Sequence, residues 1–293
     1  MSIFDKLTQT MTSLSLSLAA VALLSATSSH AALIVPEGNN LVVNHTAFDI
    51  AWTQDANLFK TQANSYAGGP ATFVNAVIAS VPGGRVNDMA NSADTPAYSG
   101  YRTLAASDFN TITGQMNWWG AQAWTTYLNS INYAGVTGWR LPDISPVNGS
   151  SFNFPVSFDG STDRGFNGTL VNSTASEFAN LFYNELGNLA AFDSTGAAQP
   201  GAGLTNSGPF SNFQNDTYRL GPEYGALDPA DPAFAWAFNP FNGGQGAGPK
   251  IGQYYGLAVR EGQVAPVPIP GAVWLMGSAL VGLVGLVRRR AAS

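Results

Sequence analysis

The last thirty residues of the chain limit which part of it can fold as an independent body. A proline-rich stretch leads into an uncharged apolar run of 17 residues, 271–287, and the basic tail 288–293 follows at once. At about 1.5 Å per helical residue the run spans roughly 25 Å, close to the roughly 30 Å of a bilayer's hydrocarbon core. Because Lys and Arg gather on the cytoplasmic side, we expect a transmembrane-type helix whose basic end, Arg288, Arg289 and Arg290, faces the cytoplasm.

The residues before this helix form a recognisable motif. Residues 267–278 read V-P-I-P-G-A-V-W-L-M-G-S, and the order of proline motif, apolar helix and arginine cluster resembles the PEP-CTERM sorting signal. The linker and sorting motif occupy 264–270, with Val267, Pro268, Ile269 and Pro270 at their centre. The resemblance implies that an exosortase of a Gram-negative bacterium removes the tail after transient membrane insertion, leaving the protein at the cell surface or in the exopolysaccharide matrix. A permanently tail-anchored envelope protein is the alternative.

The N-terminal end also looks like a processing signal. Lys6 precedes a Ser/Leu/Ala-rich apolar segment, 14–24, and Ser29-His30-Ala31 has the small-x-small pattern of a signal peptidase site. The sequence therefore predicts a signal peptide over 1–31, cleaved between Ala31 and Ala32.

The remaining body, 32–263, is acidic and lacks cysteine. Without the two ends it keeps 17 acids and 8 bases, a net charge of −9, with no cluster of Lys and Arg that could bind nucleic acid. Thiol catalysis and thiolate metal sites are excluded, because the chain has no cysteine. His45 is the only histidine of the body, and we expect it to be a surface or capped residue.

The pattern of apolar residues predicts helices early in the body and strands late, the segregation of an α+β fold. A helix is expected over 70–79, a second over 117–129 with Asn117 as N-cap, and a third with Thr174 as N-cap and Glu177 in a capping box. Glu185 is expected on an exposed helix face, and one of Trp118 and Trp119 in solvent. Strands are expected at 41–44, 48–52, 217–220, 233–238 and 254–260.

Seven short segments of the body occur in the order of one family. They resemble the DUF1566 domain, which is related to the C-terminal domain of the Legionella collagen-like adhesin. The segments are 52–59, 116–124, 138–142 (G-W-R-L-P), 176–189, 218–224, 235–238 and 256–260. The resemblance implies a C-type-lectin-like domain, with two helices packed on a twisted antiparallel sheet and long loops.

Candidate site residues lie in the loops. Asp159, Ser161 and Asp163 have the alternating oxygen ligands of a Ca²⁺ loop, although an Asx turn is the favoured interpretation. The aromatic side chains of Tyr218, Tyr224, Tyr254 and Tyr255 could stack on sugar rings.

The predicted function is a non-catalytic glycan-binding or structural module of the exopolysaccharide matrix, because no catalytic constellation is visible. The alternative is a secreted carbohydrate-active enzyme, for which Asp216 and Glu223 are an example of a carboxylate pair.

Overall fold

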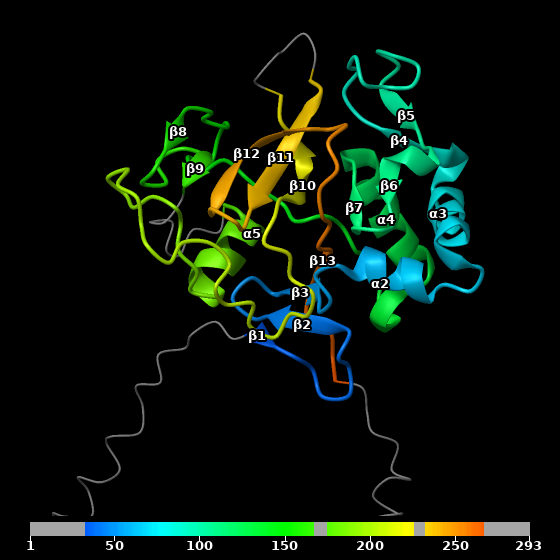
Figure 1. Ribbon diagram of the computed structural model, residues 1–293, viewed down its shortest axis with the longest axis horizontal. Helices are drawn as coiled ribbons and strands as arrows, with labels where there is room; N and C mark the ends of the chain where they lie inside the picture. The colour runs from blue at the N-terminus through cyan, green and yellow to red at the C-terminus, as the bar shows by residue number, and fades with distance from the viewer. Residues whose placement is uncertain (1–32, 167–174, 226–231, 267–293) are drawn as a thin grey trace, which may run out of the picture. The chain divides into compact units, whose positions relative to one another are not determined.

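The computed structural model describes residues 33–166, 175–225 and 232–266, all within the unit Leu33–Ser293. The α-helices are α2 (Leu58–Ser65), α3 (Gly69–Ser80), α4 (Trp118–Ser130) and α5 (Glu177–Asn180). The shorter helical turns are η1 (Pro82–Gly84), η2 (Ala106–Asp108), η3 (Tyr133–Gly135) and the π-helix η4 (Leu181–Glu185). The described residues thus confirm a mixed α+β fold (Figure 1).

The strands form two larger sheets and two small hairpins. One sheet has the order β1 (Leu33–Ile34), β2 (Val42–His45), β3 (Ile50–Thr53), β13 (Val259–Glu261). The other has the order β10 (Tyr218–Glu223), β11 (Phe234–Asn239), β12 (Gly244–Pro249), β9 (Arg164–Phe166), β8 (Val156–Ser157). The hairpins pair β4 (Arg85–Asn87) with β5 (Tyr101–Thr103), and β6 (Phe109–Asn110) with β7 (Gln115–Met116). All pairings in these sheets are antiparallel except that of β8 with β9.

Helix α4 begins where the sequence predicts. The side chain of Asn117 accepts a hydrogen bond from the Gly120 backbone at 2.9 Å, which caps the helix. The expectation that one of two adjacent tryptophans would face solvent is wrong, because both are buried. Trp118 donates its indole N–H to Gly221 O and Trp119 donates to Asp88, so each ring lies against a different neighbour.

Helix α5 differs from its predicted form at its start. Its N-cap is Ser176, whose hydroxyl accepts from Ala179 N, whereas Thr174 lies outside the described residues. Glu177 does not close a capping box; it binds Arg140 through both oxygens, at 2.7 and 2.8 Å. Burial disfavours the charge of Arg140, but the contacts with Glu177 and Glu261 outweigh that cost and raise the pKa of Arg140.

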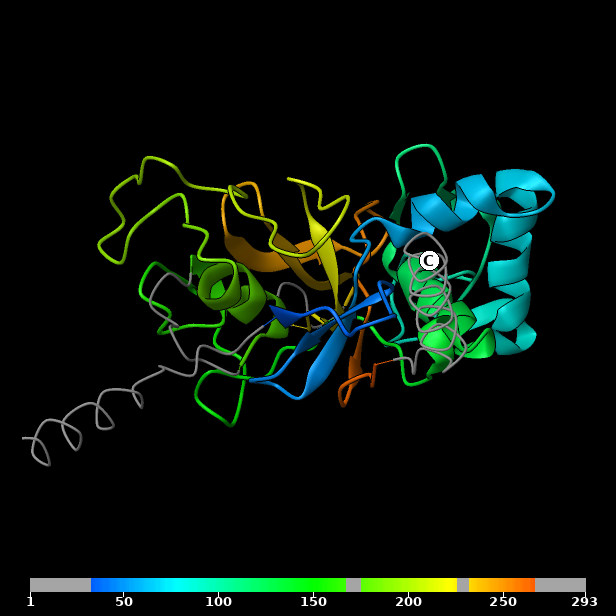
Figure 2. The same cartoon turned by 90° about the horizontal axis from the view of Figure 1, so that it is seen from below.

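Two groups of buried apolar side chains form the interior. One lies among helices α2, α3 and α4, and the other lies between the two larger sheets and α5. Figures 1 and 2 show α2 to α4 together on one side of this unit, and the five-stranded sheet with α5 on the other. Trp124, Trp139 and Trp236 are all buried, as predicted.

His45 and Glu185 are buried against each other, which corrects both expectations. His45 is fully buried, and its Nε2 lies 3.3 Å from a Glu185 oxygen whose side chain is only 7% exposed. The indole of Trp52 donates to His45 Nδ1 at 3.4 Å, which leaves the proton on Nε2. Burial lowers the pKa of His45 to about 4, so this histidine is neutral at neutral pH.

The C-terminal boundary of the body lies beyond Gln263. Val264 is buried, and its backbone exchanges two hydrogen bonds with the Asn44 side chain, both 2.9 Å long. The predicted signal peptide, residues 267–270 of the predicted sorting motif and the apolar run lie outside the described residues. Within the described part, none of the helices is long and apolar enough to cross a bilayer.

Candidate functional site

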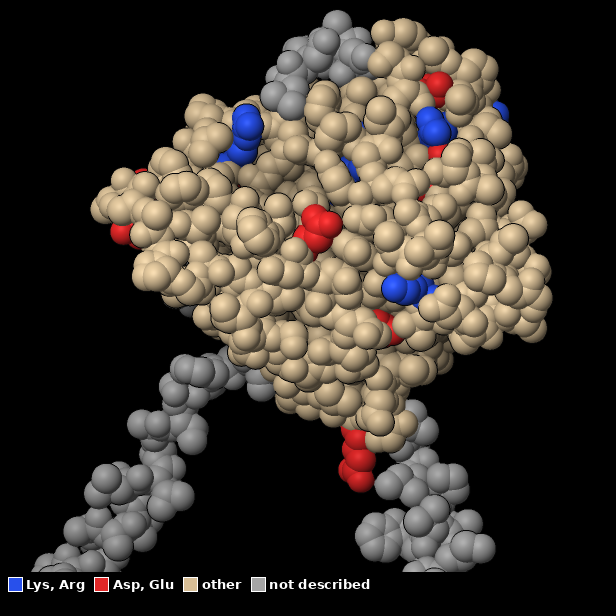
Figure 3. Space-filling view, in the orientation of Figure 1, with Lys and Arg blue, Asp and Glu red and all other residues tan. Residues whose placement is uncertain are grey.

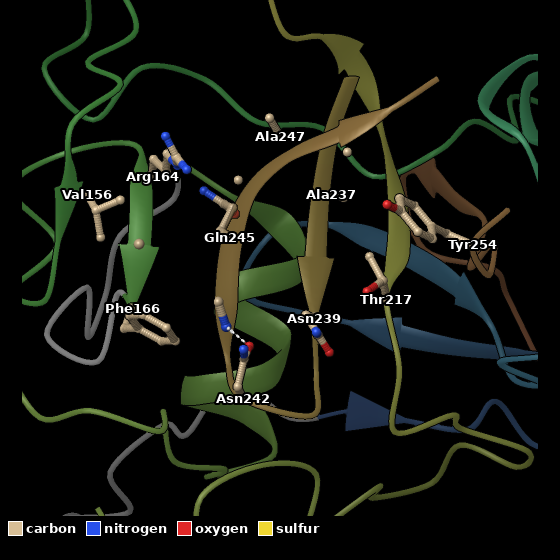
Figure 4. Close-up of a pocket in the computed structure, with 14 residues that line it drawn as sticks. Val156, Arg164, Phe166, Thr217, Ala237, Asn239, Asn242, Gln245, Ala247 and Tyr254 are labelled. Carbon is tan, nitrogen blue, oxygen red and sulfur yellow. Dashed lines mark hydrogen bonds between the residues drawn. The ribbon is translucent and has the colours of Figure 1, made fainter. Parts of the chain in front are cut away.

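An open groove of about 300 Å³ crosses one face of the five-stranded sheet. Its floor is formed by β11 and β12, one wall by Thr217 and Tyr254, and the other by Val156, Arg164 and Phe166 (Figure 4). Figure 3 shows that Lys, Arg, Asp and Glu are sparse on the face of the molecule seen there. The groove is the best candidate for a binding site because polar, aromatic and backbone groups from four strands meet in it.

The floor is flat because β12 has glycine at alternate positions. Gly244, Gly246 and Gly248 share one face of the strand and pair with Asn239, Ala237 and Ala235 of β11. A Cβ atom on Gly248 would lie 2.5 Å from the Tyr254 ring, and one on Gly246 would lie 3.5 Å from the Arg164 side chain. The glycines therefore let the two walls rest directly on the backbone.

Tyr254 stands on a buried arginine. The Arg219 guanidinium lies 4.1 Å from the centre of the Tyr254 ring, and Arg219 itself is fully buried. Its terminal nitrogens donate to Gly248 O, Pro249 O, Lys250 O and Gly252 O. Burial lowers the pKa of Arg219 to about 9, which still leaves it protonated at neutral pH. The tyrosine ring is thus fixed in place and partly exposed along the groove.

The opposite wall depends on close pairing of β8 with β9. Gly165 has φ +126°, a conformation that other residues rarely adopt, and a side chain there would collide with the Ser157 carbonyl. Arg164 and Phe166, on either side of Gly165 in the sequence, point toward β12 (Figure 4). Phe166 stacks on Phe158 with ring centres 5.8 Å apart, which supports the wall from outside.

Amide side chains lie at the end of the groove where β11 turns into β12. Asn239 and Asn242 come from this turn, and Asn242 Oδ1 accepts from Gly244 N at 2.8 Å (Figure 4). Together with Thr217 and the exposed strand backbone, they offer donors and acceptors beside an aromatic ring. A sugar ring, with an apolar face and a rim of hydroxyls, is a ligand that matches such a surface.

Of the predicted aromatic ligand residues, Tyr254 alone lines this groove. The prediction that Tyr218 and Tyr224 stack on sugar rings from loops is wrong. Both are fully buried and pack in the apolar interior between the sheets. The Tyr218 hydroxyl donates to Ala56 O and accepts from Gln214 N. Tyr255 is 9% exposed and packs against the Tyr218 ring, 5.6 Å away.

The three oxygen ligands predicted for Ca²⁺ do not converge, because Asp163 is turned into the interior, away from Asp159 and Ser161. Asp159 is exposed and accepts from the backbone and hydroxyl of Ser161, as an Asx turn does. Asp163 is fully buried and accepts from Val147 N at 2.7 Å and from Asn153 N at 2.6 Å. The hydrogen bonds of Asp159 lower its pKa. The calcium site stays a prediction, while the strands on either side of this turn contribute one wall of the groove.

The carboxylates offered as an enzymatic pair are far apart. Asp216 lies two residues before β10 and Glu223 is its last residue, so their backbones are roughly 20 Å apart at about 3.3 Å per strand residue. Glycoside hydrolysis uses carboxylates roughly 5 to 10 Å apart. Glu223 is engaged instead by the buried amine of Lys250 at 2.5 Å, which also binds Asp88 at 2.7 Å. Burial raises the pKa of Asp88, although Lys250 opposes that shift. This cluster holds the β4–β5 region against the sheet.

Several groove residues carry no local signal of a binding role. Arg164, Phe166, Asn239 and Asn242 are not among the predicted site residues, and β12 is not among the predicted strands. A visible signal was present in G-Q-G-A-G-P, because glycine at every second position of a strand leaves one face without side chains.

Comparisons with protein-family models, with curated proteins and with solved structures found no match to this chain. The resemblances to the PEP-CTERM signal and to the DUF1566 domain therefore stay predictions.

Proposed function

We propose that the protein is an exported glycan-binding module that takes a polysaccharide segment into the groove over β11 and β12. The observation that carries this proposal is the fixed Tyr254 ring beside a side-chain-free strip of strand, with amide groups at its end. A sugar ring placed on Tyr254 would have hydrogen-bonding groups along its rim.

The proposal includes a C-type-lectin-like fold for the body. It is supported by the mixed α+β architecture, by the two largely antiparallel sheets, and by long connections such as the one between η4 and β10. It also includes export through a cleavable N-terminus and an exosortase-type tail, which rests on the sequence motifs alone.

Retention of the full chain on immobilised polysaccharides tests the binding part. The chain is solubilised in a polyoxyethylene detergent, because sugar-based detergents could compete for the groove. Tyr254→Ala should reduce retention at least tenfold, whereas Tyr254→Phe keeps the ring and should retain most of the binding. Phe241→Ala is the matched control, since Phe241 is 64% exposed but does not line the groove. Absence of retention on every polysaccharide, or equal loss in both alanine variants, would refute the proposal.

Mass spectrometry of the protein from a host that has an exosortase tests the sorting part. A mature C-terminus upstream of Arg288 supports removal of the tail. Recovery of the intact basic tail in the membrane fraction would instead establish a permanent anchor.

A further inference from the structure

The groove is positively charged although the body of the protein is acidic. Arg164 is the charged residue among the side chains that line the groove, and no described lining residue is acidic. Arg219 adds a second positive charge directly beneath Tyr254, 4.1 Å from the ring centre. Of the eight bases in a body with net charge −9, one thus lines the groove and a second lies buried directly beneath its wall.

Neither of these arginines is neutralised by a carboxylate in the described part of the chain. Arg102, Arg140 and Lys250 each have an acidic partner within 4.0 Å, but Arg164 and Arg219 have none among the described residues. Arg219 is held by carbonyl oxygens, which solvate its charge without cancelling it. Burial raises the pKa of Tyr224 although the charge of nearby Arg164 opposes this shift, so the phenol stays neutral at neutral pH and does not offset the arginine.

The position of Arg164 suits contact with a ligand. Its aliphatic stem lies across Gly246, with Cγ and Nε 3.5 and 3.6 Å from where a Cβ atom of that glycine would be. The side chain therefore borders the same face of β12 as Tyr254. Arg164 lies at the β9 side of the groove, and Tyr254 lies at the β10 side (Figure 4). A ligand that spans the floor would meet the tyrosine ring at one side and a guanidinium at the other.

We propose that the groove binds an anionic glycan, with a sugar carboxylate on Arg164 and a ring on Tyr254. This inference rests on the proposed glycan-binding function and specifies its ligand class. Arg pairs with carboxylates through two parallel hydrogen bonds, so the contact selects for a planar acidic group as well as for charge. The positive field of Arg219 beneath Tyr254 favours the same sign of ligand.

The experiment compares polygalacturonate with its methyl-esterified form, which keeps the backbone but masks the carboxylates. The full chain should bind polygalacturonate at least tenfold more tightly, and added salt should reduce this preference. Arg164→Gln should bring the two affinities to within about threefold of each other, and Arg164→Lys should recover only part of the preference, because lysine lacks the two-pronged geometry. Arg260→Gln is the matched control on another strand and should leave the preference intact.

The outcomes separate this inference from the proposed function. Equal binding of both polymers by the unmodified chain, lost in Tyr254→Ala, would overturn the anionic preference and keep glycan binding. Binding of polyglutamate as tight as that of polygalacturonate would overturn it too, because the groove would then select charge without a sugar ring. No binding of either polymer, or of any other polysaccharide, would refute glycan binding itself. A preference that survives in Arg164→Gln would overturn the role of Arg164.

Discussion

The two faces of the five-stranded sheet are built from the same strands but carry opposite kinds of side chain. On the inner face, Trp236 and Phe238 pack against aromatic rings of neighbouring elements and are fully buried. On the outer face, Ala237 pairs with Gly246, and little more than backbone lies between the groove walls. Because strand residues alternate between faces, each mutation reaches only one of these surfaces. Stability and ligand binding should therefore be separable residue by residue.

The largest expected effect belongs to the inner face. Trp236 packs against Tyr224, Phe152 and Phe154 with ring centres 4.5, 5.1 and 6.0 Å away. Trp236→Ala should lower the free energy of unfolding by about 3 to 5 kcal/mol, the usual cost of removing a buried tryptophan. Ala237→Gly, the next residue on the outer face, should cost about 0.5 to 1 kcal/mol. Urea denaturation measures both, and comparable losses would contradict the division between faces.

Low pH should also lower the stability of the interior and leave ligand binding in the groove unchanged. The pKa of His45 is lowered to about 4 by burial, whereas in the unfolded chain it is about 6.5. The unfolded state therefore binds more protons between these values, so stability is fully present above about pH 6.5 and falls as the pH drops toward 4. The loss should reach about 2 to 3 kcal/mol at pH 4.5.

His45→Gln removes the titrating group and should flatten this part of the pH profile. The groups that face His45 are Glu185, Trp52 and Phe48. No described residue that lines the groove is a carboxylate or a histidine, so binding of a neutral polysaccharide should stay constant while the protein is folded. A pH profile equally steep in the variant would assign the acid sensitivity to another group.

In the predicted Ca²⁺ loop, substitution of the buried Asp163 and of the exposed Asp159 should differ in their effect on stability. Asp163→Asn removes a charged acceptor of two backbone N–H groups and should cost about 1 to 3 kcal/mol in thermal or urea unfolding. Asp159→Asn alters an exposed turn and should leave the midpoint unchanged. Chelation should leave the midpoint of the unmodified chain where it is. A Ca²⁺-induced rise that Asp159→Asn abolishes would establish the metal site instead.

Local signals explain which elements could be predicted from the sequence. The Asn117 cap, the proline and glycine stop after α3, and the apolar runs of β3 and β11 are each determined by residues within one turn or strand. Helix α2 and the β4–β5 hairpin were missed because their stability comes from distant partners. Trp124, for example, donates to Gln62 of α2 across 62 positions in the sequence, at 2.8 Å.

The candidate site was harder to predict, because it depends on which strands lie side by side. Tyr254 was found as a loop aromatic, but its role follows from Arg219 beneath it and Gly248 beside it. Tyr218 and Tyr224 were predicted on the same grounds as Tyr254, but both are buried, because strand alternation turns them inward. Arg164 reaches the groove only because β9 pairs with β12, a contact between residues about 80 positions apart.

The smallest effect on stability should come from filling the groove floor. A Cβ atom on Gly246 would meet the flexible Arg164 side chain at 3.5 Å, an ordinary contact, and valine favours strand conformation. Gly246→Val should therefore change the free energy of unfolding by less than about 0.5 kcal/mol. The added methyl groups occupy the path between Arg164 and Tyr254, so retention on polysaccharide should fall at least tenfold. Gly225→Val, an exposed glycine outside the groove, should leave retention unchanged. Undiminished binding by Gly246→Val would mean that the ligand site lies elsewhere and that the outer face is only the uncovered side of a structural sheet.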